Sequence, residues 1–193
     1  MIISHRHRFV FIHCRKTAGS SMAGLLSRHL GPDDLHLGTW PEAFNQGIEP
    51  NRRARRDLLH PLVAASYTAR LARKPGSLLD KARRIAAFNG AQRQKYRKTL
   101  GPSPEHPSAV EMRAFASKAW SNYFKFCFVR NPYERAISDY LWRTNKHDAT
   151  KISFGEFLER MKQGDFSHPV VPRRFDNWPM YTINNQIAVD FIG

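Results

Sequence analysis

The chain has 193 residues, a formal net charge of +15, and 41% hydrophobic residues. This length suits one α/β domain with its own core, and no apolar run approaches the roughly 18 residues of a membrane-spanning helix. The charge excess indicates an anionic partner, such as a nucleotide, a polyanionic glycan, a nucleic acid or a membrane surface.

The two cysteines, Cys14 and Cys127, are too few for a disulfide framework, which favours a reducing compartment. The N-terminal residues M-I-I-S-H-R-H-R lack the apolar region of a signal peptide. We therefore expect a cytoplasmic protein, or a fragment trimmed from a longer one.

The first predicted unit is a strand, a loop and a helix. A strand-like run at residues 9–13 leads into the loop C-R-K-T-A-G-S-S at residues 14–21, and an apolar helix follows over residues 22–30. This arrangement is typical of phosphate sites, because a helix start offers free N–H groups and a positive dipole end. The Walker A pattern G-x-x-x-x-G-K-[ST] is absent, since Lys16 precedes Gly19. That order argues against an ordinary ATPase or GTPase.

The side chains of this loop also suit an anion. Gly19 lets the backbone approach closely, Ser20 and Ser21 add hydroxyl donors, and Lys16 adds a mobile positive charge. His13, which ends the strand, is interpreted as structural. The predicted phosphate-binding residues are Arg15, Lys16, Thr17, Ala18, Gly19, Ser20 and Ser21.

A basic region of mostly helical character is predicted over residues 35–100. Residues 35–50 are predicted as loop, and residues 52–74 and 78–98 as helices separated by a break at Pro75-Gly76. Residues 51–100 hold fourteen Lys and Arg against two Asp. This excess indicates either a solvated helical face or an anion-binding surface.

A second strand and helix follow. After a break at residues 101–104, Ser108 and Glu111 form a capping box that predicts a helix start. An aromatic and β-branched run at residues 124–129 then predicts a buried strand that ends at Arg130. Asn131 suits a helix N-cap and is followed by proline, so a helix starts at the strand's exit. Arg130 lies at the strand exit and Ser138 lies about two turns into the helix, so together they could bind a second phosphate.

The last part of the chain carries weaker signals. Ser153 with Glu156 predicts another helix, residues 164–186 are predicted as irregular, and residues 189–193 form a strand-like run. Because the sequence stops directly after this run, we expect a truncated C-terminus.

Together, the two strand–loop–helix units resemble the sulfotransferases that use 3′-phosphoadenosine 5′-phosphosulfate (PAPS), in particular the chondroitin, HNK-1 and heparan 2-O carbohydrate enzymes. The loop at residues 12–21 is similar to their 5′-phosphosulfate loop, although Cys14-Arg15 stands where the family has I-P. The sequence from Arg130 to Tyr140 matches their 3′-phosphate motif R-N-P-x-x-R-x-x-S-x-Y at every fixed position. The stretch around His106 and the closing residues 189–193 also resemble family segments.

The resemblance implies a single sulfotransferase domain over residues 1–193, with a three-layer, P-loop-like α/β fold and a mostly parallel central sheet flanked by helices. It implies that Lys16 stabilises the phosphate departing from PAPS, and that Arg130 and Ser138 hold the 3′-phosphate. Arg135 either joins them or pairs with an acid.

The acceptor is expected to be a hydroxyl of a carbohydrate, and an anionic glycan would match the basic region together with Arg173 and Arg174. Trp40, Trp178 and Tyr181 are candidates to stack on sugar rings. An alcohol acceptor must lose a proton as the S–O bond forms, and a neutral imidazole suits this near pH 7. His106, just before a helix start, is the preferred base, while His60, Glu42 and Glu105 stay as alternatives.

Two other functions are consistent with parts of the sequence. A P-loop-type kinase would need an acid that binds Mg²⁺, for which Asp190 is the one candidate. A basic nucleic-acid-binding module would explain the charge but not the R-N-P motif. The preferred interpretation expects no nucleic acid and no metal, because no His, Cys and Asp cluster has ligand spacing.

Overall fold

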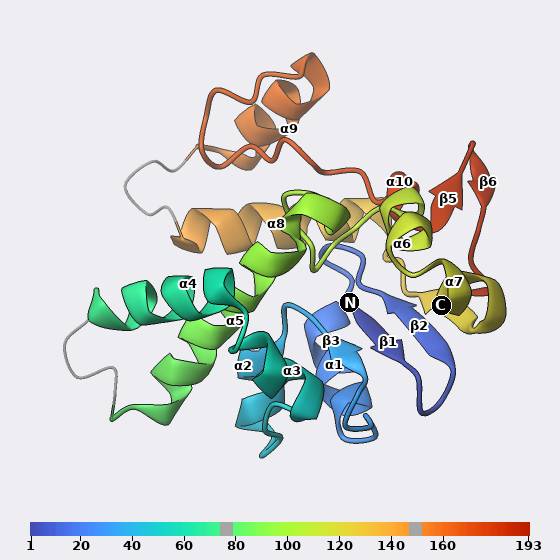
Figure 1. Ribbon diagram of the computed structural model, residues 1–193. Coiled ribbons are helices and arrows are strands. Elements are labelled where there is room, and N and C mark those ends of the chain that lie inside the picture. The colour runs from blue at the N-terminus through green and yellow to red at the C-terminus, as the bar shows by residue number, and fades with distance from the viewer. Residues whose placement is uncertain (74–78, 147–151) are drawn as a thin grey trace.

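The structure is a computed structural model that describes residues 1–73, 79–146 and 152–193 (Figure 1). The strands are β1 (Ile2–Ser4), β2 (Phe9–Ile12), β3 (Leu35–His36), β4 (Phe124–Cys127), β5 (Thr182–Ile183), β6 (Gln186–Ile187) and β7 (Phe191–Ile192). The helices are α1 (Gly19–Ser27), α2 (Trp40–Asn45), α3 (Arg52–Asp57), α4 (Pro61–Ala72), α5 (Lys81–Leu100), α6 (Ala109–Phe115), α7 (Ser117–Asn122), α8 (Pro132–Lys146), α9 (Phe154–Gln163) and α10 (Trp178–Tyr181).

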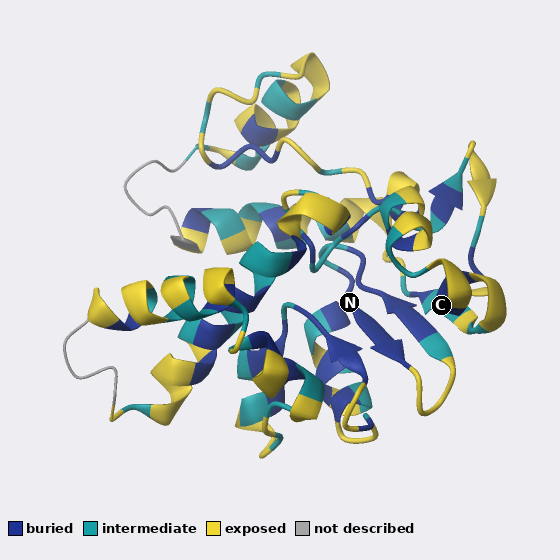
Figure 2. Cartoon of the chain, in the orientation of Figure 1, coloured by how far each residue is buried: buried dark blue, intermediate teal, exposed yellow. Residues whose placement is uncertain are grey.

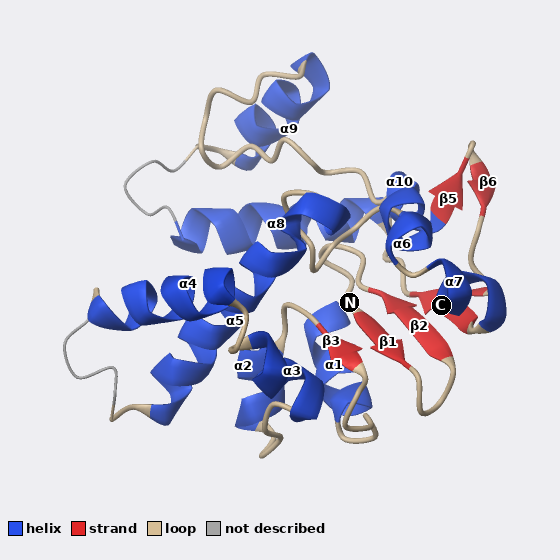
Figure 3. Cartoon of the chain, viewed as in Figure 1, coloured by secondary structure: helices blue, strands red, loops and turns tan. Residues whose placement is uncertain are grey.

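Five strands form one mixed sheet in the order β3-β1-β2-β4-β7 (Figure 3). β2 pairs in parallel with β4, and β4 pairs in parallel with β7. β1 is antiparallel to both of its neighbours, so it runs against the other four strands. The α/β class is therefore confirmed, and the sheet is mostly parallel with one reversed strand.

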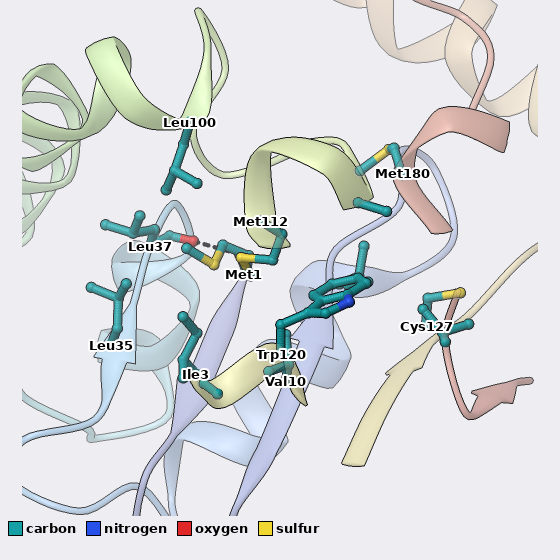
Figure 4. Close-up of a cluster of buried hydrophobic side chains, with 14 of the residues drawn as sticks. Met1, Ile3, Val10, Leu35, Leu37, Leu100, Met112, Trp120, Cys127 and Met180 are labelled. Carbon is teal, nitrogen blue, oxygen red and sulfur yellow. Dashed lines mark hydrogen bonds between the residues drawn. The ribbon is translucent and has the colours of Figure 1, made fainter. Parts of the chain in front are cut away.

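Helices contact both faces of this sheet because successive side chains of a strand point to opposite sides. On one face, Val10 and Cys127 pack with Met112 and Trp120, which come from α6 and α7 (Figure 4). On the other face, the aromatic side chains of β2 and β4 pack against α1. Figure 2 shows the central strands buried between these layers, with exposed residues on the outer sides of the helices.

The register of the parallel pair positions the site. Ile12 lies opposite Cys127, so β2 and β4 reach the same edge of the sheet together. The loop that leads to α1 and the segment that leads to α8 therefore leave the sheet side by side. In open α/β sheets, ligands bind at this carboxyl edge.

Several predicted boundaries were wrong. Residues 35–50 are not one loop, because they contain β3 and α2, both of which are short and held by distant partners. Trp40 of α2 is buried against His36, with ring centroids 4.4 Å apart, and its Nε1 donates to Gln92 Oε1 at 3.0 Å. Contacts of this kind have no local sequence signal. The burial of Trp40 also removes it from the candidates for stacking on a sugar.

The helix expected over residues 52–74 is two helices, since Pro61 cannot continue α3 and instead starts α4. The predicted break at Pro75-Gly76 lies outside the described residues. The irregular segment at residues 164–186 includes α10 and the start of the hairpin β5–β6, whose turn has Asn184 and Asn185 at φ 51° and 60°. Asparagine tolerates this left-handed conformation, which favours such hairpins.

The predicted capped helix starts were confirmed. Ser108 and Glu111 form the full capping box of α6, and Ser153 caps α9. At α8, the Asn131 side chain accepts from the Tyr133 backbone N–H at 2.9 Å, and the helix starts at proline, as expected.

Candidate active site

The loop between β2 and α1 is held in a conformation that favours an anion. Lys16 and Ala18 have φ of 60° and 57°, in the left-handed region that non-glycine residues seldom adopt. The Thr17 hydroxyl donates to the Cys14 carbonyl at 3.1 Å and fixes the bend. Backbone strain of this kind clusters at functional sites, and alternating conformations turn successive N–H groups into an anion-binding concavity.

One cavity, of about 580 Å³, opens beside this loop. It is bounded by the loop, by α8 and by the segment before α6. The predicted site residues that line it are Arg15, Lys16, Thr17, Ala18, Gly19, Ser20, His106, Arg130 and Ser138. The two motifs, more than a hundred residues apart in the sequence, thus share one cavity.

Sequence reasoning missed the part of this wall that α8 supplies after Ser138. Asp139, Trp142 and Arg143 also line the cavity. The Lys16 ammonium lies 5.2 Å from the centroid of the Trp142 ring, and Arg143 Nε donates to Asp139 Oδ1 at 3.1 Å. Helical spacing contained the signal, because a residue four positions after Ser138 lies on the same helix face.

Positive charge is concentrated around Lys16. Burial lowers the pKa of Lys16, and the nearby charges of Arg143 and Arg130 lower it further, against an opposing contribution from Asp139. Arg130 itself is half-exposed and forms an ion pair with Glu134, with Nε 3.0 Å from Oε2. Three cations at one cavity wall create a site that an anion stabilises.

The cavity is also lined by a neutral imidazole with a defined tautomer. His106 Nδ1 lies 2.7 Å from the backbone carbonyl of His13. Because a carbonyl only accepts, Nδ1 must carry the proton, and Nε2 is left as a proton acceptor. Burial lowers the pKa of His106 to about 4, although the hydrogen bond to His13 opposes this shift. The ring is therefore neutral at pH 7.

Two carboxylates lie on the same side of the cavity. Glu42 and Glu105 both line it, and each has one buried oxygen, Oε2, without a partner among the described residues. The other oxygen of Glu105 pairs with Arg93. Burial is the largest single influence and would raise the pKa of Glu105, but the charge of Arg93, the hydrogen bonds of the carboxylate and the charge of His106 together lower that pKa. Buried polar atoms normally have partners, so these two unpaired oxygens are unusual features of the cavity surroundings.

Gly19 also has a packing role within the fold. A Cβ at this position would lie 2.0 Å from Cδ2 of His13. The glycine therefore makes room for the buried His13 ring, which packs 4.5 Å from the His106 ring. This contact supports the structural interpretation of His13.

Arg15 is tied to the protein rather than directed at the anion. Its backbone N–H donates to Asn177 Oδ1 at 3.1 Å, and Asn177 Nδ2 donates back to the Arg15 carbonyl at 2.9 Å. Its guanidinium donates to the His106 carbonyl at 3.4 Å. Arg15 and Asn177 thus link the anion loop to the His106 segment.

Some candidate residues lie away from the cavity lining. Ser21 is exposed on α1, and His60 precedes α4. Among the residues that the structure describes, Arg135 pairs with Phe175 rather than with an acid: the Phe175 carbonyl accepts at 2.7 Å and its ring lies 4.1 Å away. Asp190 binds Lys125 at the start of β4, at the far edge of the sheet, where it cannot serve as a Walker B acid.

The fold and the site define an α/β protein with a strained, lysine-bearing loop at the carboxyl edge of its sheet. Residues 1–193, the whole chain, match the Sulfotransferase family, and the chain belongs to that family. It is therefore a transferase of the class that moves sulfuryl groups.

One similar protein is an uncharacterized protein of Archaeoglobus fulgidus, which is 29% identical over 90 residues, or 45% of this chain and 68% of the relative. No solved structure matches. In the described parts of the chain, none of the helices is both long and apolar enough to cross a membrane. The same parts hold no group of three or more His, Cys, Asp or Glu suited to bind a metal ion.

Proposed function

We propose that the protein transfers the sulfuryl group of PAPS to a hydroxyl of a carbohydrate or similar acceptor. The observation that carries this proposal is the composition of the cavity. One wall presents Lys16, the strained loop and Arg130, which suit the two phosphate groups of the donor. The same cavity is lined by neutral and acidic proton acceptors, His106, Glu42 and Glu105.

In the proposed reaction, the acceptor oxygen attacks sulfur while the bond from sulfur to the bridging oxygen of the 5′-phosphate breaks. The products are a sulfate ester, 3′-phosphoadenosine 5′-phosphate (PAP) and one proton. Charge grows on the bridging oxygen in the transition state, and a fixed cation there stabilises that state more than the ground state. Lys16 is the proposed cation.

Other residues of the cavity would bind the 5′-phosphate and 3′-phosphate groups of the donor. The backbone of residues 17–20 and the Ser20 hydroxyl face the 5′-phosphate in this proposal, at the start of α1. Arg130 and Ser138 hold the 3′-phosphate, since a guanidinium fork suits bidentate contact with phosphate. Arg130 must exchange its ion pair with Glu134 for this contact, which costs little because both side chains are largely solvated.

The proposed base is His106. Its tautomer supports this role, because the proton on Nδ1 leaves Nε2 as the acceptor, and the lowered pKa keeps the ring unprotonated near neutral pH. Glu42 and Glu105 line the same cavity and stay as alternatives, whereas His60 does not line it. Comparison of single variants at the three lining residues assigns the base.

Equilibrium binding of PAP, ATP and ADP tests the donor. A PAPS-dependent enzyme binds PAP more tightly than either of the others, while a P-loop-type kinase prefers ATP with Mg²⁺. A nucleic-acid-binding module shows no preference for the 3′-phosphate. Transfer of radiolabelled sulfate from PAPS to a panel of sugars then identifies the acceptor.

A further inference from the structure

A cluster of arginines lies between α4 and α5, next to the cavity but outside its lining. It consists of Arg70 and Arg73 of the α4 segment with Arg93 and Arg97 of α5. The two helices are packed together (Figure 1). Arg93 and Arg97 are four positions apart, and so share one face of α5.

One arginine of the cluster packs directly on the backbone of α5 at Gly90. A Cβ at Gly90 would lie 2.6 Å from Nη1 of Arg70 and 2.8 Å from its Cζ, so the guanidinium rests directly on the glycine. Gly90 stands inside a 20-residue helix, where glycine is destabilising relative to alanine. Its effect here is to let one arginine lie close to the others.

The charges of the cluster are poorly compensated. Burial lowers the pKa of Arg70, and the charges of Arg93, Arg73 and Arg97 lower it further. Its Nε donates to the Ser66 hydroxyl at 3.3 Å, a neutral partner that supplies no counter-charge. Within residues 1–73, 79–146 and 152–193, Arg93 pairs with Glu105, and no acidic side chain pairs with the other three. Four like charges held together with one carboxylate partner favour a bound anion.

The position of the cluster connects it to the acceptor side of the site. Arg93 is shared between the cluster and Glu105, and Glu105 lines the cavity beside His106. An acceptor whose hydroxyl faces His106 would extend past Glu105 toward the arginines.

We infer that Arg70, Arg73, Arg93 and Arg97, seated on Gly90, form a binding subsite for an oxyanion carried by the acceptor, either a sulfate, a phosphate or a carboxylate group. The assignment of the oxyanion to the acceptor rests on the proposed sulfotransferase function. The binding of the oxyanion itself does not depend on turnover.

The first test is a titration of the whole chain with sodium sulfate at constant ionic strength, balanced with sodium chloride. The NMR signal of the Arg70 Nε–H reports binding, and Arg70→Lys assigns that signal. Arg97→Gln is compared with Lys98→Gln, which makes the same charge change on the adjacent exposed residue. We expect saturable binding in the wild type and in Lys98→Gln, weakened about tenfold in Arg97→Gln, since one charge-assisted hydrogen bond is lost. A shift that never saturates, or equal weakening in both variants, overturns the subsite.

A second pair of variants keeps every charge. Gly90→Ala displaces the Arg70 guanidinium, while Gly155→Ala adds a methyl group in α9 at an ordinary contact distance of 3.9 Å from Ser153 Oγ. We expect weaker sulfate binding in Gly90→Ala alone. Unchanged sulfate binding in Gly90→Ala would show that the packing of Arg70 on Gly90 does not contribute to the subsite.

The last measurement identifies the source of the anion. With PAPS as donor, Arg97→Gln should raise KM about tenfold for a sulfated or carboxylated sugar and leave KM unchanged for its neutral counterpart. If sulfate binding depends on Arg97 while neither KM changes, the site holds a free ion and its assignment to the acceptor is wrong. If the chain does not use PAPS, the sulfate titration still stands, so the two proposals fail separately.

Discussion

Replacement of Lys16 by alanine removes the one lysine of the cavity lining and tests the proposed transition-state contact. In the structure this ammonium faces the Trp142 ring and, within the described residues, forms no ion pair with a carboxylate. Its charge is therefore directed to the cavity. Loss of a contact made mainly in the transition state costs about 3 kcal/mol, which is on the order of 10²-fold in kcat.

Binding of PAP should suffer less in the same variant. Arg130, Arg143 and the start of α1 still surround the phosphates, so we expect Kd for PAP to rise by less than about tenfold. Radiolabelled transfer from PAPS gives kcat, and calorimetric titration with PAP gives Kd. Lys118→Ala, on the exposed face of α7, is the matched control and should leave both values unchanged.

Two outcomes would refute this reasoning. A Lys16→Ala enzyme with kcat near the wild-type value would show that the lysine makes no transition-state contact. A loss of PAP affinity as large as the loss of kcat would show that Lys16 binds ground state and transition state equally.

Three further predictions concern other parts of the cavity. Arg130→Ala should weaken PAP binding by on the order of tenfold but leave the affinity for an analogue without the 3′-phosphate unchanged, and equal losses in calorimetry would exclude the contact. His106→Gln should lower kcat by roughly 10² to 10⁴ without changing Kd for PAP. Folding lowers the pKa of His106 to about 4, from about 6.5 in the unfolded chain. Between these two pH values the unfolded chain therefore binds more protons than the folded chain, and stability falls as the pH falls. Urea unfolding should show the wild type losing more stability than His106→Gln over that range, and parallel curves would contradict this. Gly19→Ala should destabilise the fold by roughly 1 to 3 kcal/mol, because its methyl group would overlap the His13 ring, and thermal unfolding would show no such loss if the ring simply turned aside.

Local signals allowed much of the fold to be predicted. Capping residues act through hydrogen bonds within one helical turn, which is why the starts of α6, α8 and α9 were found. Apolar runs predicted β2 and β4 for the same reason. By contrast, β3 and the reversed strand β1 have only two or three residues each and depend on pairing with their neighbours.

The candidate site divides in a similar way. The sequence by itself determined the anion loop around Lys16 and the Arg130–Ser138 pair, because a strand exit followed by a helix start is a local pattern. Only the tertiary structure decided that both face one cavity, since this follows from the parallel register of Ile12 with Cys127. The tertiary structure also brought Glu42, Glu105 and His106 to one wall and left His60 and Asp190 outside it. A residue's type and spacing carry its chemistry, but the packing of distant segments decides which of these residues meet.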